Sequence, residues 1–352
     1  MNKSFAKTES KSLLIGSRFV LLTTSGFALA IVAALTSSSK AVLVKLIYQQ
    51  AALTPLELLT LRLVLAAPLF TILAFAGKQP VRADSNGETR FSSWLLVAWL
   101  GFSGYYFASL TDFIGLTYIS AGLERLVLFT YPTFVLLFES INKRALPSGK
   151  IILAVLICYL GLSLAFAHDL TLGTNLSATW KGVAWVVLSG FTFSLYYMST
   201  NRGVYYFGVT RLTGLAGLTA SLFTLIHFAI SGGELTRILA LTPDSWFLIA
   251  VMAIVCTVLP SLLLVKAITK IGPALTANIG ALGPVITILL ANVILGESMS
   301  GLQFLGMTAV IWGVSQMRPV KVKQEKDCKA VFKRKCRFDT SSNKPAHRLA
   351  NQ

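Results

Sequence analysis

Two long apolar stretches constrain the fold of this chain most strongly, because each is about long enough to cross a bilayer as a helix. They are residues 120–141 and 272–295, and each contains a proline, Pro132 and Pro284 respectively. When the sequence is aligned to itself so that the two prolines coincide, the flanking apolar and small residues match without a gap. Interrupted apolar helices at matching places in two halves are the best sequence indication of the midplane site of a secondary transporter.

The composition places the chain in a membrane. Hydrophobic residues make up 55% of the 352 residues and charged residues only 13%, with a mean hydropathy of +0.70. Soluble domains carry about 25% charged residues, so the chain is predicted to be an integral membrane protein. The formal charge of +17 does not indicate a nucleic-acid partner, because no aromatic residues are interleaved with the basic ones. The four cysteines show no CxxC spacing, and neither a disulfide framework, a metal site nor a cofactor is predicted.

The apolar runs predict an all-α membrane protein of ten transmembrane helices, arranged as two inverted five-helix repeats. The domain boundaries expected from these runs are an N-terminal segment 1–23, repeat one 24–167, a linker 168–180, repeat two 181–317 and a basic tail 318–352. The expected spans are 26–49, 56–77, 92–116, 120–141, 151–167, 182–200, 212–230, 246–265, 273–295 and 302–316.

Lysine and arginine predict the orientation of these spans. Most of the 31 basic residues lie in the N-terminal segment, in alternate loops and in the tail. By the positive-inside rule both termini are cytoplasmic and the linker 168–180 is extracytoplasmic, in a multi-pass protein of the plasma (inner) membrane. The tail is expected to contact anionic lipid headgroups, at about 1 kcal/mol per basic residue near the surface. The sequence does not indicate an oligomeric state.

Charged residues inside the spans are the candidates for function. A charge at the centre of a membrane helix costs about 2.5–3.5 kcal/mol on insertion scales, so these residues are expected to face a cavity or one another. Neighbours such as Glu124 and Arg125 point about 100° apart around a helix, which favours partners on other helices. The sequence allows two ion pairs between helices: Asp112 with Arg125, and Glu124 with Lys40 or Arg62. The charges are Lys40, Lys45, Glu57, Arg62, Asp112, Glu124 and Arg125.

Each candidate also has a structural interpretation. Lys45 and Glu57 lie near helix ends, where long side chains reach the interface, and Arg62 is as well explained as a clamp or gate. Asp112 is a candidate proton carrier, because a carboxyl inside a membrane helix can exchange its charge for a proton. The substrate-binding residues predicted from sequence are Lys40, Arg62, Asp112, Glu124, Arg125, Tyr131, Pro132, Asn278 and Pro284. The two prolines are expected to break their helices and free carbonyls toward the cavity.

The order and spacing of three segments resemble a known family. The segments TPLELLTLRLVLAAP (54–68), TYISAGLERLVLFTYPTFVLL (117–137) and GPALTANIGALGPVITILLANVILGE (272–297) are similar to the EamA-type transporters of the drug/metabolite transporter superfamily. The resemblance covers about residues 24–317. It implies ten helices, an inverted-repeat fold and movement of a small metabolite. The chain departs from the family pattern at Arg144-Ala145, where a Gly-Glu pair is expected, and at Lys40.

These observations together predict a secondary active transporter, an exporter or permease, for a small polar metabolite such as an amino acid or related anionic or zwitterionic compound. Transport is expected to proceed by alternating access, with proton coupling as one option. The alternative in the same class is a flippase for a lipid or lipid-linked headgroup. A membrane-embedded enzyme is disfavoured because His168, His227 and His347 are scattered. The chain also lacks a GxxxxGK[ST] nucleotide-binding loop.

Overall fold

The computed structural model describes residues 26–77, 89–142, 149–171, 175–280, 282–296 and 300–316. The chain divides into two units, Met1–Met317 and Arg318–Gln352, and every described residue belongs to the first. The segments 1–23 and 318–352, for which a cytoplasmic location and lipid contact are predicted, lie outside the described residues, as do Arg144 and Ala145.

Every regular element in the described part of the chain is helical. Six helical stretches, some made of two or three consecutive elements, are long and apolar enough to cross a membrane, and shorter apolar helices accompany them. The helical elements follow one another in two halves. In the first half they are α2 (Gly26–Ser38), α3 (Lys40–Gln50), α4 (Pro55–Ala76), α5 (Thr89–Leu100), η1 (Gly101–Phe107), α6 (Ala108–Leu116), α7 (Ala121–Leu128), α8 (Tyr131–Asn142) and α9 (Gly149–Thr171). In the second half they are α10 (Leu176–Phe207), α11 (Val209–Ile230), α12 (Leu235–Leu239), α13 (Pro243–Ala253), η2 (Ile254–Val258), α14 (Leu259–Ile271), α15 (Pro273–Ile279), α16 (Leu282–Leu290), η3 (Ala291–Leu295) and α17 (Gly301–Gln316).

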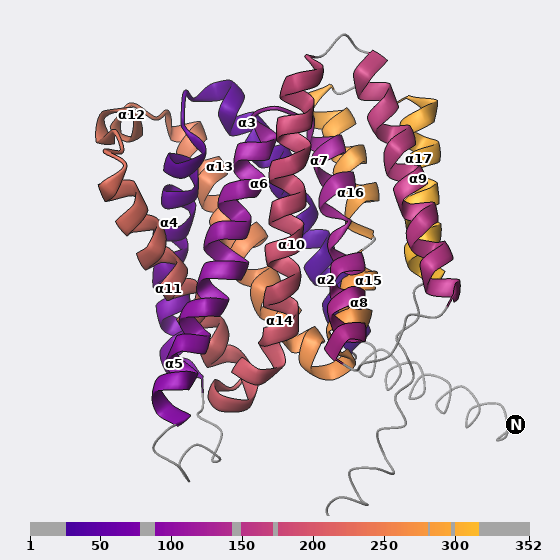
Figure 1. Cartoon of the computed structure of the whole chain (residues 1–352). Coiled ribbons are helices and arrows are strands. Elements are labelled where there is room, and N and C mark those ends of the chain that lie inside the picture. The colour runs from indigo at the N-terminus through magenta and orange to yellow at the C-terminus, as the bar shows by residue number, and fades with distance from the viewer. Residues whose placement is uncertain are drawn as a thin grey trace, which may run out of the picture. The chain divides into compact units, whose positions relative to one another are not determined.

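Consecutive helices join end to end into spans that run back and forth through the bundle (Figure 1). We call the end at which α2 begins and α17 ends the terminal end, and the end at which α9 meets α10 the linker end. The first span, α2–α3, runs toward the linker end, whereas the first span of the second half, α10, runs away from it (Figure 1). The two halves are therefore inverted relative to each other, as predicted. Helix extends to Thr171 and resumes at Leu176, so it covers most of the segment 168–180 that the sequence assigned to a linker.

Interruptions fall at matching places in the two halves. The third span contains the π-helical turn η1 after α5, and the eighth contains η2 after α13. The fourth span breaks between Leu128 and Tyr131, and the ninth breaks between Ile279 and Leu282. The alignment that superposes Pro132 on Pro284 also superposes these breaks to within about a residue. Each break comes just before its proline, where the missing N–H and the ring disfavour continuous helix.

The two halves pack together because the spans of one half lie against spans of the other. Helix α2 packs on α14, and its counterpart α10 packs on α6, the counterpart of α14. The remaining spans pair with their own counterparts: α4 with α11, α7 and α8 with α16 and α15, and α9 with α17. Small residues allow the close approaches, because Gly217 of α11 meets the ring of Phe70 of α4 so tightly that a Cβ would not fit. Each main helix contact thus joins one half to the other.

The apolar surface is divided between a core and the outside of the bundle. Large side chains such as Phe70, Phe113 and Leu123 are fully buried, whereas Phe75, Ile230 and Val293 are at least 80% exposed. Such exposure is expensive in water at about 25 cal/mol per Å², and it fits a surface covered by lipid. The interior is therefore where polar side chains have to find partners.

Candidate functional site

The break in the first span positions the first charged residue. Helix α2 ends at Ser38 and α3 begins at Lys40, so nearby carbonyls are released for other partners. The carbonyl of Ser37 accepts a hydrogen bond from Arg125 Nη2 at 3.2 Å, and that of Ser38 accepts one from Thr287 Oγ1 at 2.6 Å. The break is therefore held by one side chain from each half.

Lys40 pairs with Asp112 of α6. Its Nζ lies 2.7 Å from Oδ2 of Asp112, whose side chain is 1% exposed, against 16% for that of Lys40. Asp112 also lies beside Glu124, so that the two carboxyl groups are neighbours in the interior. This differs from the expected pairing of Asp112 with Arg125, since the start of α3 brings Lys40 to the same level in the bundle.

Glu124 and Arg125 contact each other despite being adjacent on α7. The Nε of Arg125 lies 3.8 Å from Oε2 of Glu124, too far for a hydrogen bond. The expectation that neighbours in sequence cannot meet was wrong, because the long arginine side chain turns back across its helix. Glu124 is fully buried. Within the described part of the chain, neither of its oxygens receives a hydrogen bond from a side chain or backbone donor.

Arg62 is held by a neutral partner. Its Nη2 donates to Ser109 Oγ at 2.9 Å, and its guanidinium lies 4.9 Å from the centre of the Phe113 ring, a cation–π distance. It does not pair with Glu124 as considered from sequence. Glu57 lies away from this cluster, completing the capping box of α4 with Thr54 and approaching Arg237 at 3.9 Å. Lys45 is half-buried and does not line the cavity described next.

A cavity of about 160 Å³ lies against these cations, many times the 10–15 Å³ that one water molecule requires. Lys40, Arg62 and Arg125 line it, and within the described residues no carboxylate does. In the first span its lining runs from Ala30 to Lys40 and stops there. The cations therefore stand at the end of the cavity nearer the linker end. The remaining wall belongs to both halves, with Ser37, Ser109, Tyr105, Leu128, Phe129, Tyr131, Ser189, Phe193, Tyr196, Tyr197, Cys256, Thr257, Ser261, Leu264 and Thr276 among its residues.

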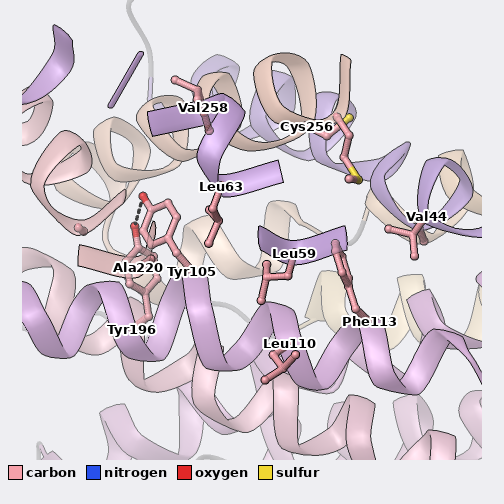
Figure 2. Packing of buried hydrophobic residues seen from close by; sticks show 14 of the residues in the cluster. Val44, Leu59, Leu63, Tyr105, Leu110, Phe113, Tyr196, Ala220, Cys256 and Val258 are labelled. Atoms are coloured by element: carbon pink, nitrogen blue, oxygen red, sulfur yellow. Dashed lines mark hydrogen bonds between the residues drawn. The ribbon is translucent and has the colours of Figure 1, made fainter. Parts of the chain in front are cut away.

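Aromatic side chains form one wall of the cavity. The hydroxyls of Tyr105 and Tyr196 lie 3.3 Å apart and join η1 to α10, and both rings belong to the packed core (Figure 2). Tyr131 donates to the carbonyl of Ala277 at 3.1 Å, and its ring meets that of Tyr197 at 5.4 Å between centroids. The tyrosines thus bridge the two halves along the wall of the cavity.

The predicted site residues divide into four groups. Lys40, Arg62, Arg125 and Tyr131 line the cavity, whereas Asp112 and Glu124 are buried behind the cations. Pro132 and Pro284 are buried next to the two helix breaks and do not themselves line the cavity. The side chain of Asn278 lies outside what the structure describes.

Sequence reasoning missed the hydroxyl and thiol groups of the cavity. Ser37, Ser109, Ser189, Thr257, Ser261, Thr276 and Cys256 line it, and Cys256 lies 3.2 Å from Ser39 Oγ. Serine and threonine are common throughout membrane helices, where they bond to carbonyls of their own helix, so nothing in the sequence distinguishes these from the others. Among the described residues, no group of three or more His, Cys, Asp or Glu side chains is placed to hold a metal ion.

The inverted halves and the cavity between them can be compared with known proteins. The EamA-like transporter family model matches residues 24–167 and 180–317, one copy in each half. The chain belongs to the EamA-like transporter family. It is also 30% identical over 294 residues to the uncharacterized transporter YcbK of Bacillus subtilis (strain 168), covering 82% of this chain and 91% of that protein.

A solved crystal structure supports the fold in the same way. It matches with a TM-score of 0.57 and 16% identity, covering 83% of this chain and 95% of the other. At this identity the likeness concerns the fold alone. This EamA-like chain is thus a multi-pass membrane transporter, and its buried charges are the feature that calls for explanation.

Proposed function

We propose that the protein is a secondary active transporter of a small anionic or zwitterionic metabolite, such as an amino acid, working by alternating access. The observation that carries the proposal is the lining of the cavity between the two halves. Three cations, Lys40, Arg62 and Arg125, face it, and no described carboxylate does.

The charge balance of the cluster favours an anionic group. Lys40, Arg62 and Arg125 outnumber Asp112 and Glu124 even when both carboxyls are ionised, which leaves at least one positive charge without a counterpart. Arg62 and Arg125 bond to a hydroxyl and a carbonyl respectively, so their charges remain available at the cavity. Uncompensated charge inside a membrane protein is costly, and a carboxylate or phosphate group of a substrate would complete the set.

The position of the cavity suggests which state is seen. Its lining extends from the cations toward the terminal end, and the positive-inside rule assigns that end to the cytoplasm. We therefore interpret the structure as closed on the outside, with its cavity on the cytoplasmic side of the cations, in the plasma (inner) membrane. Rocking of the inverted halves about the cations would then present the same residues to the other side.

The alternative, a flippase for a lipid headgroup, differs in the molecule that would occupy the cavity. A lipid would place its acyl chains outside the cavity, so loading should depend on lipid composition rather than on dissolved solute. An enzyme would convert its substrate. Both alternatives become outcomes of the test below.

The test begins with untargeted comparison of metabolites in cells with and without the protein. Carboxylates and zwitterions that change are then assayed for uptake into liposomes containing the purified full chain. Lys40→Met is expected to abolish transport at normal expression. Lys45→Met removes the same charge from the same helix outside the cavity and should transport normally. Four outcomes would each contradict the proposal. They are full activity of inserted Lys40→Met protein, a preference for cationic solutes, transfer of lipid alone, and chemical conversion of the substrate.

A further inference from the structure

The Asp112–Glu124 contact has a chemical requirement of its own. Both side chains are buried at 1% exposure or less. Their charges act on each other inside one cluster, in which Lys40 contacts Asp112 and Arg125 approaches Glu124. Lys40 lies 2.7 Å from Asp112, whereas Arg125 stays 3.8 Å from Glu124, beyond hydrogen-bond distance. Two buried carboxyls in close contact do not both stay ionised without a strong partner for each, and such pairs hold a shared proton. Within the described residues no donor bonds to the oxygens of Glu124. A proton on one carboxyl would turn their contact into a hydrogen bond.

The groups that face this pair come from five elements. From α3 come Lys40, which pairs with Asp112, and Tyr48, which lies near it. Helix α4 contributes Arg62 and η2 contributes Cys256, which lies near the cations. The pair itself joins α6 to α7, and α7 adds Arg125 at 3.8 Å from Glu124. Lys40 is the cation in closest contact with the pair and also lines the cavity.

We propose that Asp112 and Glu124 form a proton site, and that Lys40 couples its occupancy to the anion in the cavity. While Lys40 bonds to Asp112, the pair holds one proton, on Glu124. An anion that draws Lys40 into the cavity removes the cation from Asp112, which then takes a second proton from water. This rests on the proposed function and adds a direction to it: the anion and the proton bind together and cross the membrane together.

Lys40 lies between the pair and the cavity. It is the first residue of α3, directly after the one-residue interruption at Ser39. Its side chain already has 16% exposure toward the cavity. Lys40 can therefore bond to either of two acceptors: the buried carboxylate of Asp112, or the anionic group of a substrate in the cavity.

Infrared spectroscopy of the purified full chain in lipid nanodiscs tests the proton site without any substrate. At neutral pH the band of protonated carboxyl groups should lose one group in Glu124→Gln relative to the natural protein. In Lys40→Met, which imitates the state with Lys40 withdrawn, the intensity of this band should rise by the equivalent of one carboxyl group. In Lys40→Met/Asp112→Asn that added intensity should disappear. Lys40→Arg keeps the cation and should match the natural protein. An unchanged band in Glu124→Gln or in Lys40→Met would overturn the proposal.

A second measurement covers variants that fail to fold. If Glu124 carries the proton, Glu124→Gln replaces a neutral group with a neutral group of the same shape, and its melting temperature should stay within a few degrees. If Glu124 is instead an ionised partner of Arg125, the same change leaves Arg125 unpaired and the melting temperature should fall steeply, which would refute the proton site.

Transport then separates the inference from the proposed function. Uptake of a carboxylate found in the metabolite comparison should be accompanied by acidification inside liposomes that hold a pH indicator. Carboxylate uptake without proton movement, or with protons moving outward, would refute the coupling and leave the transporter intact. If no carboxylate is transported, the proposed function fails, while the infrared result still decides whether the pair holds protons.

Discussion

The two halves of the molecule share one architecture but differ in chemistry. Both have a π-helical turn in their third span and a break in their fourth, yet the buried charges of the described residues, Glu57, Arg62, Asp112, Glu124 and Arg125, all lie in the first half. In the alignment of the halves, Leu264, Thr276 and Ala277 occupy the places of Asp112, Glu124 and Arg125. Duplication therefore accounts for the helices and the cavity, while charge selectivity comes from one half.

The difference extends to volume. Gly280 and Gly283, at the break of the ninth span, occupy the places of Leu128 and Tyr131 at the break of the fourth. The hydroxyl of Tyr131 lies so close to Gly280 that a Cβ there would collide with it. Large side chains of one half thus fill the space that small residues of the other leave open, and the cavity wall is complementary rather than symmetric.

The largest expected effect concerns how the inverted halves are oriented across the membrane. A cysteine at Asn175, an exposed helix end at the linker end, should react with an impermeant maleimide added to intact cells. A cysteine at Asn142, an exposed helix end at the terminal end, should stay unlabelled. The four native cysteines are replaced by alanine first, and lysed cells provide the control in which both positions react. The opposite pattern would reverse the predicted orientation.

The next largest effect is expected when a buried charge of the first half is replaced by the apolar residue found at the matching place in the second half. Asp112→Leu introduces the residue found at the matching place and removes the partner of Lys40. Breaking a buried ion pair typically costs about 3–5 kcal/mol. We expect about 3 kcal/mol, since Lys40 still reaches the water of the cavity. Unfolding of the purified protein in detergent measures it.

The double variant provides the control for Asp112→Leu. Lys40→Met/Asp112→Leu should recover most of the lost stability while remaining unable to transport, because the pair is gone but no charge is stranded. If the double variant is less stable than the single one, the two residues do not act as a pair.

Most of the fold followed from the sequence because it depends on hydrophobic pattern. The apolar runs, the two prolines and the distribution of lysine and arginine predicted the all-α architecture and the inverted halves. The partners of the charges could not be predicted, because they depend on helix rotation and on the break at Ser39. Lys40 rather than Arg125 meets Asp112, and Arg125 turns back to Glu124. The hydroxyls of the cavity were missed because they have no distinguishing pattern.

The complementarity at the two breaks can be tested with one methyl group. Gly280→Ala places a Cβ against the Tyr131 hydroxyl and should displace its hydrogen bond to Ala277, at a cost of about 1–3 kcal/mol for overpacking. Gly283→Ala adds the same group in the same break, where the nearest atom is Ser38 Oγ at 3.4 Å, and should be nearly neutral. Thermal unfolding of the two variants side by side measures the contrast, and equal losses would argue against it.

The smallest effect is expected at the linker end, where Glu57 of the first half approaches Arg237 of the second. Their atoms lie 3.9 Å apart and Arg237 is 42% exposed, so the pair is worth at most about 1 kcal/mol. Arg237→Gln should therefore barely change unfolding, because Glu57 keeps its capping bond to the backbone N–H of Thr54 at 2.7 Å. If this contact holds the outer side closed, however, the variant should change the transport rate several-fold at unchanged stability. Destabilisation as large as that of Asp112→Leu would contradict this and show that the exposed pair is a main tie between the halves.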